Sequence, residues 1–142
     1  MYKKKKGFTL GEIIIYLGIT TLILALPTSF MLIKERTYEL KVEREINAIH
    51  DFLMEAKQLS RKDNSYGEIT FDNLENTLIY RNKISNSFLK LEAVKVSNNM
   101  NNVIAISNMG MINNAGTILI TDKNNNQRKI TITVGLGKIN VK

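Results

Sequence analysis

The chain has 142 residues, a formal net charge of +7 and no cysteine. This length suits one small domain in addition to a long helix. The lack of cysteine excludes a disulfide framework, thiolate catalysis and thiolate metal ligation. Four lysines stand together at positions 3–6, so more than half of the net charge belongs to the N-terminal end.

An uncharged apolar run follows these lysines. Residues 13–33 carry no formal charge, and Glu12 is the only charged residue between Phe8 and Ile33. About 20 apolar residues are enough for a helix to cross a bilayer, and the lysines before them would keep the N-terminus in the cytoplasm. A carboxylate at the edge of such a helix is costly, so Glu12 is expected to have a partner or a function.

The order Gly7-Phe8-Thr9-Leu10-Gly11-Glu12 before this run resembles the class III leader of type IV prepilins and pseudopilins. The resemblance implies that prepilin peptidase removes residues 1–7 by cutting after Gly7 and then N-methylates Phe8. It also implies that Glu12 helps the mature subunit to assemble into a filament. Gly11 departs from the family, which usually has an aliphatic residue there.

The same stretch allows three other interpretations. A plain membrane anchor explains its length and orientation, but not the carboxylate of Glu12. A secretory signal peptide has an apolar core of roughly 7–15 residues and a small-residue cleavage site, which Ala25-Leu26-Pro27 does not provide. A buried helix of a soluble protein fits poorly with four adjacent lysines before an uncharged run.

Residues 8–61 are predicted to form one long helix. Residues 8–33 would be its transmembrane and assembly half, and residues 34–61 its amphipathic half, because charged residues appear abruptly from Lys34 onward. Steps of four and three residues place one apolar stripe on a single face of the second half. The stripe consists of Val42, Ile46, Ile49, Leu53 and Ala56, and it is widened by Phe52 and Leu59. Its width predicts that a domain packs against it.

Residues 62–142 are predicted to form a β-rich globular head. Short alternating runs indicate strands, and polar or asparagine-rich segments separate them. The predicted strands are 68–72, 77–81, 87–91, 93–97, 103–107, 117–121, 129–134 and 138–141. The expected fold is therefore α+β, with a long N-terminal α-helix packed on a small antiparallel β-sheet head.

The C-terminal strands give a second resemblance. The segment from Gly116 to Val141, with its polar hairpin, looks like the end of minor pseudopilins. The branches that it implies are tip-region subunits of type II secretion, minor type IV pilins and competence pseudopilins.

Catalytic and metal-binding patterns are missing from the sequence. His50 is the only histidine, so no His or Cys cluster has metal-ligand spacing, and no nucleophile elbow accompanies it. Asp122 precedes three asparagines, but this loop lacks the acidic positions of a calcium site. The chain is expected not to be an enzyme, and to need no cofactor or metal.

The expected function is that of a structural minor subunit of a type IV pilus-like or pseudopilus filament, in type IV pili, type II secretion or competence DNA uptake. Its partners would be prepilin peptidase, other pilins or pseudopilins, and the membrane. It would cross the cytoplasmic membrane once, with the N-terminus cytoplasmic and the head outside, before joining a cell-surface or periplasmic filament. The alternative is a DNA-binding minor pilin with a basic C-terminal head. Its candidate DNA contacts are Lys123, Arg128, Lys129, Lys138 and Lys142.

Overall fold

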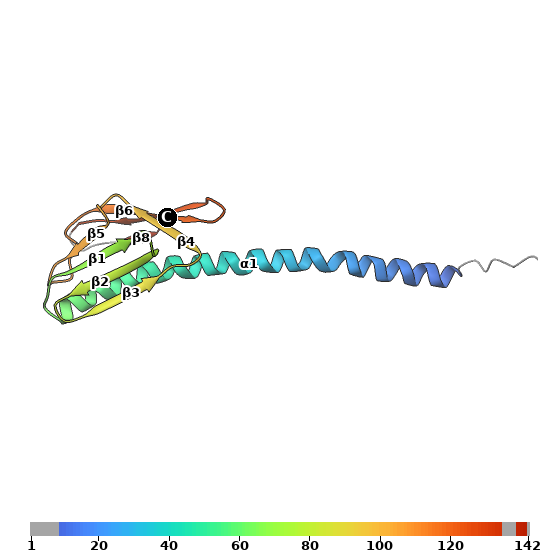
Figure 1. The fold of residues 1–142 in the computed structure, drawn as a ribbon, viewed down its shortest axis with the longest axis horizontal. Coiled ribbons are helices and arrows are strands. Elements are labelled where there is room, and N and C mark those ends of the chain that lie inside the picture. The colour runs from blue at the N-terminus through green and yellow to red at the C-terminus, as the bar shows by residue number, and fades with distance from the viewer. Residues whose placement is uncertain (1–8, 135–138, 142) are drawn as a thin grey trace, which may run out of the picture. The chain divides into compact units, whose positions relative to one another are not determined.

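A computed structural model describes residues 9–134 and 139–141, without the side chains of residues 25–29 and 139–141. These residues form one helix and eight strands (Figure 1). Helix α1 (Leu10–Lys62) confirms the predicted long helix within two residues at each end. The chain divides into two compact units, Met1–Glu39 and Leu40–Lys142, and α1 contributes to both. The second unit, called the head from here on, comprises the C-terminal part of α1 from Leu40 together with the residues 62–142 that were predicted as a globular head.

Helix α1 ends in a Schellman motif. The N–H of Ser65 donates to the carbonyl of Ser60 at 3.1 Å, and the N–H of Asn64 donates to that of Arg61 at 3.3 Å. Asn64 has a φ of 45°, which asparagine tolerates better than most L-residues. The motif satisfies two of the last helical carbonyls and directs the chain into the first strand.

The head contains two antiparallel four-stranded sheets. Sheet A has the strand order β3-β2-β1-β5 and sheet B the order β4-β6-β7-β8. Sheet A is built from β1 (Gly67–Asp72), β2 (Thr77–Asn82), β3 (Asn86–Lys90) and β5 (Val103–Ile106). Sheet B is built from β4 (Val94–Asn98), β6 (Gly116–Asp122), β7 (Gln127–Ile132) and β8 (Ile139–Val141). All the predicted strands are present, but the chain passes from sheet A to sheet B, back to A and again to B.

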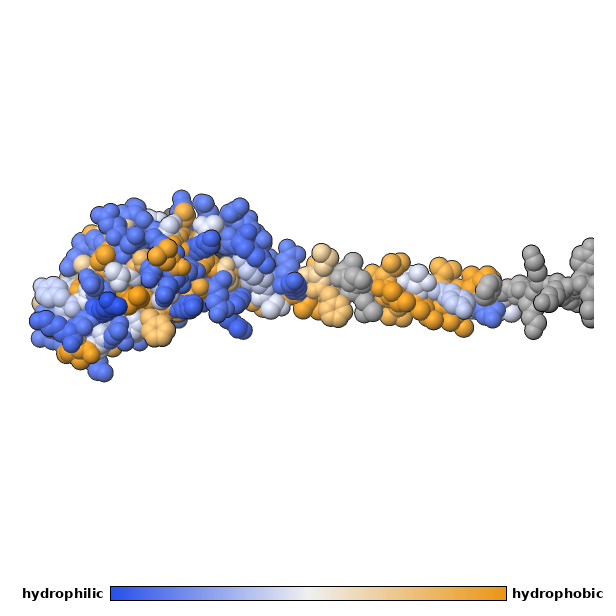
Figure 2. Space-filling view, in the orientation of Figure 1, coloured by the Kyte–Doolittle hydropathy of each residue, from blue (hydrophilic) through white to orange (hydrophobic). Residues whose placement is uncertain are grey.

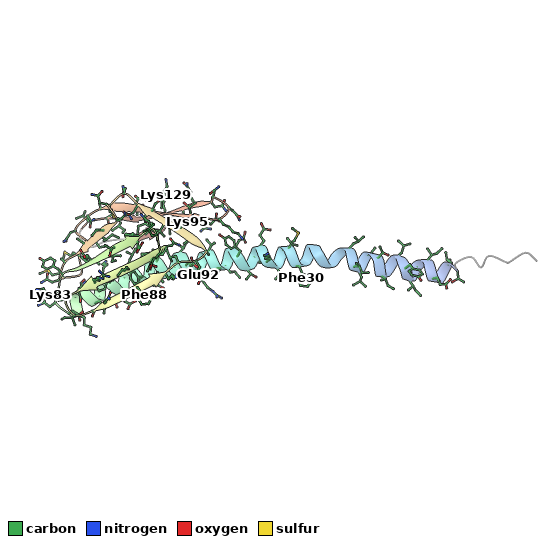
Figure 3. All side chains as sticks on the ribbon, in the orientation of Figure 1. Phe30, Lys83, Phe88, Glu92, Lys95 and Lys129 are labelled. Atoms are coloured by element: carbon green, nitrogen blue, oxygen red, sulfur yellow. The ribbon has the colours of Figure 1, made fainter. Side chains whose placement is uncertain are left out.

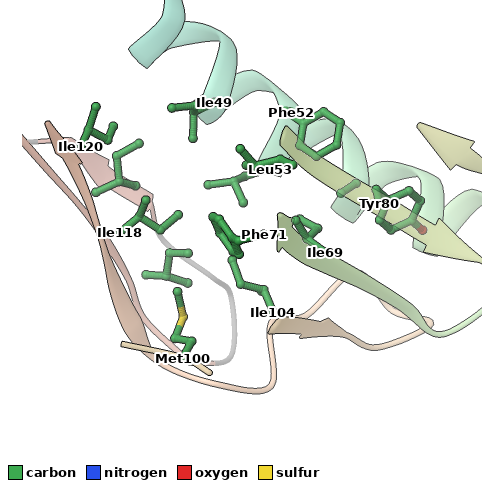
Figure 4. Packing of buried hydrophobic residues seen from close by; sticks show 14 of the residues in the cluster. Ile49, Phe52, Leu53, Ile69, Phe71, Tyr80, Met100, Ile104, Ile118 and Ile120 are labelled. Carbon is green, nitrogen blue, oxygen red and sulfur yellow. The ribbon is translucent and has the colours of Figure 1, made fainter. Parts of the chain in front are cut away.

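The core lies where the apolar face of α1 meets the inward side chains of both sheets (Figure 4). Ile49 and Leu53 are fully buried at its centre, and Val42 and Leu59 are partly buried at its margins. Every residue of the stripe predicted from the sequence packs in or against this core. Burial of each large aliphatic side chain contributes about 1.5–3 kcal/mol, which explains why the head is organised around this part of α1.

Glu45 of α1 holds the loop where the chain leaves sheet A for sheet B. Its carboxylate accepts hydrogen bonds from the consecutive backbone N–H groups of Glu92, Ala93 and Val94, at distances of 2.9–3.2 Å. One turn earlier, Lys41 forms a 2.7 Å ion pair with Glu92. The hydrogen bond and the attraction in this pair raise the pKa of Lys41 and lower the pKa of Glu92.

Two glycines allow the backbone of the head to approach α1 closely. A Cβ atom at Gly67 would lie 2.6 Å from Cε2 of Tyr80 and 2.8 Å from Oγ of Ser60. Gly110 has a φ of 72°, and a Cβ atom there would lie 2.6 Å from the carbonyl oxygen of Lys57. Any larger residue at either position would push a segment of the head away from the helix.

Candidate functional site

The first turn of α1 is closed by a reciprocal cap between Thr9 and Glu12. Oε2 of Glu12 accepts hydrogen bonds from the backbone N–H of Thr9 at 2.8 Å and from its hydroxyl at 2.9 Å. In return, the Thr9 hydroxyl accepts the backbone N–H of Glu12 at 3.3 Å. This is the capping box, a Ser/Thr followed three residues later by Glu or Gln. The sequence carried this signal, and it gives Glu12 a local role that the resemblance alone did not suggest.

The predicted cleavage and methylation site lies just before this cap. Gly7 and Phe8 are outside the described residues. The departure at Gly11 can be assessed, since a Cβ atom there would meet nothing within 4 Å. Packing within the single chain therefore does not require glycine at this position.

The N-terminal half of α1 exposes apolar side chains around its circumference (Figure 2). Large apolar residues from Leu10 to Leu24 and from Phe30 to Ile33 are 46–77% exposed. The hydroxyl groups of Thr20 and Thr21 donate to helix carbonyls one turn earlier, at 2.6 and 3.0 Å, so that they present little polarity outward. In the part of the chain whose side chains are described, which omits residues 25–29, no helical stretch is both long and apolar enough to cross a membrane.

The cations proposed for DNA contact do not share one surface. Lys123, Arg128 and Lys129 are exposed, while Lys138 and Lys142 lie outside the described residues. Arg128 stands opposite the buried Ile120, whereas Lys129 stands opposite Leu119. Because successive residues of a strand point to opposite faces, Arg128 and Lys129 point to different faces of sheet B.

Lys95 is a basic residue that the sequence analysis did not select. It lies on β4, two residues from Ser97, and the pairing places Ser97, Leu119 and Lys129 in one row across three strands. Lys95 and Lys129 therefore share the outer face of sheet B, and Figure 3 shows them on the same side of the head. The alternation of side chains along a strand predicts that Lys95 and Ser97 share one face. It does not predict that Lys129 lies on the same face of the sheet, because that depends on the strand pairing.

Asp122 and the asparagines that follow it form hydrogen bonds with one another in the loop between β6 and β7. The carboxylate of Asp122 accepts the backbone N–H groups of Asn124 and Asn126 at 2.7 and 2.9 Å, and it also accepts the side chain of Asn126. These bonds, led by that of the Asn126 side chain, lower the pKa of Asp122 and shape the tip of the β6–β7 hairpin. Within the described residues, no group of three or more acidic or histidine side chains could hold a metal ion.

Comparison with known proteins identifies a likeness of fold. No protein-family model matches the sequence, and no curated protein matches it. Among solved structures, the minor pseudopilin EpsH from the Type 2 Secretion System of Vibrio cholerae is similar, with a TM-score of 0.57 and 10% sequence identity. The similarity covers 72% of this chain and 96% of that chain. The chain has a pseudopilin-like fold. The predicted α+β architecture, a long N-terminal helix packed on an antiparallel β head, is thereby confirmed.

Proposed function

We propose that this chain is a minor subunit of a pseudopilus or type IV pilus-like filament, with a structural and not a catalytic role. The observation that carries the proposal is the pseudopilin-like fold joined to a helical half whose described apolar side chains are exposed. An apolar surface of this extent calls for a membrane or a partner to cover it. In a filament, the equivalent helices of neighbouring subunits would provide that cover.

Processing and insertion would precede assembly. The apolar run of residues 13–33 would hold the chain in the cytoplasmic membrane, with the lysines at positions 3–6 inside the cell and the head outside. Prepilin peptidase would cut between Gly7 and Phe8 and methylate Phe8, and the mature chain would leave the membrane for a periplasmic or cell-surface filament. The residue order Gly7-Phe8-Thr9-Leu10 supports this proposal.

Glu12 would act in assembly through its charge. Cleavage frees an ammonium group on Phe8, and the carboxylate of a neighbouring subunit is its natural counter-charge in an apolar core. The capping box leaves this role open, because only Oε2 of Glu12 accepts the two hydrogen bonds from Thr9. A carboxylate can accept about four hydrogen bonds, and no described residue donates one to Oε1, so this oxygen can accept from a second subunit.

The N-terminal mass of the chain tests this proposal. The chain is extracted from membranes of cells that contain prepilin peptidase, and the mature protein is expected to begin at methylated Phe8. Gly7→Leu should leave the precursor uncut, because the peptidase must fit a small residue at the cut. Gly11→Leu is the matched control and should be cut normally. A chain that still begins at Met1, or that begins after Ala25, would contradict the proposal.

DNA binding by the head is a second candidate, favoured by Lys95 and Lys129 on one exposed face of sheet B. Contacts from these lysines would be to phosphates, so affinity should fall steeply as salt increases and depend little on sequence. Gel shifts can separate the two faces of the sheet. Lys129→Ala should weaken binding, whereas Arg128→Ala should not, because Arg128 points to the other face. Equal effects of the two changes, or no shift at all, would exclude this candidate.

A further inference from the structure

The face of sheet A that points away from α1, named here the outer face of sheet A, carries a row of three apolar residues and one threonine. The strand pairing aligns Phe88, Ile79, Thr70 and Val103 in one row across all four strands. Phe88 is 74% exposed and the other three are half-buried. Figure 3 shows Phe88 on the β3 edge of the sheet. A row of this kind across a whole sheet indicates a surface that packs against another molecule.

The neighbouring row of the same face carries opposite charges on its two central strands. Arg81 on β2 stands directly opposite Glu68 on β1, and both are exposed. Although they face each other in register, no ion pair within 4 Å joins them in the described structure. Asn86 and Ala105 complete the row on the two edge strands. The positive and negative groups thus lie on either side of the line between β1 and β2.

We propose that the outer face of sheet A binds a second copy of this chain, related by a two-fold axis that runs along the strands between β1 and β2. This axis places β2 over β1 of the other copy and β3 over its β5. Arg81 of each copy then faces Glu68 of the other, so the charge pair forms twice. Phe88 faces Val103 of the other copy. Sheets packed face to face in this aligned manner lie about 10 Å apart.

The direction of the axis makes the head parts of the two α1 helices run in the same direction. Figure 1 shows β2 and β3 running alongside the part of α1 that belongs to the head. A two-fold axis along these strands therefore leaves the head parts of both α1 helices pointing the same way. Two chains held in one membrane or one filament need this arrangement. A closed isologous contact of this type also stops at two copies and does not continue into a further array.

The outer face of sheet A is hollowed at its end near the C-terminal end of α1. A hollow of about 430 Å³ opens there, lined in part by Tyr66, Arg81 and Lys83. Ile84, in the turn after β2, is 71% exposed beside it. Because the axis places the end of β2 over the start of β1, Ile84 of one copy lies over Tyr66 and the hollow of the other.

The area of the outer face of sheet A limits the affinity expected between the two copies. Four strands at about 4.8 Å and four to six residues at about 3.4 Å give a face of at most roughly 19 by 20 Å. This is smaller than the roughly 800 Å² per partner of a standard interface. The contact should therefore be modest in affinity and depend on confinement of both copies to one membrane, so the test uses full-length chains in membranes.

The absence of cysteine from the chain allows a geometric test. Two differently tagged full-length chains are co-expressed, one with Phe88→Cys and the other with Val103→Cys. Facing Cα atoms about 10 Å apart are too distant for a disulfide, which allows at most about 7 Å. Membranes are therefore treated with a short thiol-specific cross-linker that bridges facing positions across this gap, and a mixed cross-link is expected. Two Phe88→Cys chains are the matched control, because three strand spacings, about 14 Å, separate the two positions in addition to the gap between the sheets.

The charge pair gives an independent test on the same cysteine chains. Arg81→Glu in both chains, or Glu68→Arg in both chains, should lower the yield of the mixed cross-link at least tenfold. Arg81→Glu in one chain and Glu68→Arg in the other should restore it, although each chain keeps its own internal repulsion. The proposal is overturned if the Phe88 control cross-links as well as the mixed pair, if no mixed cross-link forms, or if the combined charge variants fail to restore it. Any of those outcomes would show that the outer face of sheet A does not bind a second copy of this chain in this manner.

Discussion

The hydroxyl groups of Ser60 on α1 and Tyr80 on β2 lie 2.8 Å apart inside the head and share a hydrogen bond. Both side chains are fully buried. The side-chain amide of Asn82 donates to the Tyr80 hydroxyl and to Asp63, at 2.9 Å in each case. This network ties the last turn of α1 to sheet A, so polar contacts as well as apolar packing fix the helix on the sheet.

The head is expected to fold without the N-terminal half of α1. A fragment of residues 34–142 retains the whole core, since the compact unit that holds it begins at Leu40. Its circular dichroism should show helix and strand together and a single cooperative unfolding transition. A fragment with helix but no strand would contradict the expectation that the sheets form on their own with the amphipathic half of α1.

Tyr80→Phe should lower the free energy of unfolding of this fragment by about 1–2 kcal/mol. The change keeps the ring but removes the hydroxyl, which leaves the buried Ser60 without its partner. Urea unfolding measures the effect. Tyr66→Phe is the matched control, because Tyr66 is 69% exposed and its change should stay within about 0.5 kcal/mol. Equal effects of the two changes would contradict a structural role for the network.

Glu45→Ala should loosen the connection between the two sheets. Three consecutive backbone N–H groups lose their acceptor, so we expect the free energy of unfolding to fall by about 2 kcal/mol. Hydrogen exchange followed by mass spectrometry should show that Glu45→Ala speeds exchange at residues 92–94, relative to the wild-type chain, more than elsewhere in the head. Glu43→Ala changes an exposed carboxylate two residues away on the same helix and should leave this exchange unaltered. Unchanged protection at residues 92–94 in Glu45→Ala would show that the carboxylate does not hold the loop.

Asp63 should make the stability of the head depend on pH in the acid range. Hydrogen bonds from Ser85 and then from Asn82 lower the pKa of Asp63 below its ordinary value of 3.8. A carboxyl group with a lowered folded-state pKa stabilises the fold above its ordinary pKa, and this contribution is lost as pH falls through the lowered value. Asp63→Asn should therefore flatten the loss of stability with acid, from about pH 5 downward.

Ser85→Ala provides the graded control for this pH dependence. It removes the hydrogen bond that lowers the pKa of Asp63 most, so the pKa should move back toward its ordinary value. The acid-dependent part of the stability should shrink but not vanish, because Asn82 still donates to Asp63. An unchanged acid profile in both variants would exclude Asp63 as its source.

The elements of the fold follow from local patterns that the sequence carries openly. The apolar stripe from Val42 to Ala56 predicted which face of α1 is buried, because a helix repeats every 3.6 residues whatever packs on it. Alternation in runs such as Ile69 and Phe71 predicted strands for the same reason. Asparagine also marked turns correctly, and all the described non-glycine residues with positive φ are asparagines, among them Asn76, Asn101 and Asn125.

The arrangement of those elements depends on contacts far apart in the sequence. Alternation shows which side of a strand is buried, but not which strand lies beside it, so the division into two sheets was not predictable. The decisive contacts include the carboxylate of Glu45, 48 residues from the N–H of Ala93. Nothing in the local sequence distinguishes Glu45 from the exposed Glu43.

In the candidate site, too, some features follow from the local sequence and others depend on contacts far apart in the sequence. The Thr9–Glu12 cap is local and was predictable from the spacing of a Ser/Thr and a Glu, since the capping box needs only these two residues. The distribution of the basic residues over the two faces of sheet B was not predictable. It depends on strand pairing, which decides the face on which Arg128, Lys129 and Lys95 lie. The outer face of sheet A is likewise visible only once Arg81 and Glu68 are known to be opposite each other.

Glu12 now has two separable roles, the cap on its own helix and the proposed counter-charge for a neighbouring subunit. Glu12→Gln keeps the cap, because glutamine also completes a capping box, but it removes the charge. Thr9→Val removes the hydroxyl of the cap and keeps the charge. A chain that uses Glu12 only as a cap should tolerate the first change better than the second, and a filament subunit should show the reverse order.

The most direct measurement is cross-linking of these two variants to the other pilin-like subunits in membranes, at equal abundance and after cleavage at Gly7 has been verified. We predict that Glu12→Gln lowers cross-linking at least tenfold relative to the wild-type chain, because the ammonium of Phe8 loses its counter-charge. Thr9→Val should retain most of it. Wild-type cross-linking by Glu12→Gln would contradict assembly of this chain through the charge on its N-terminal helix.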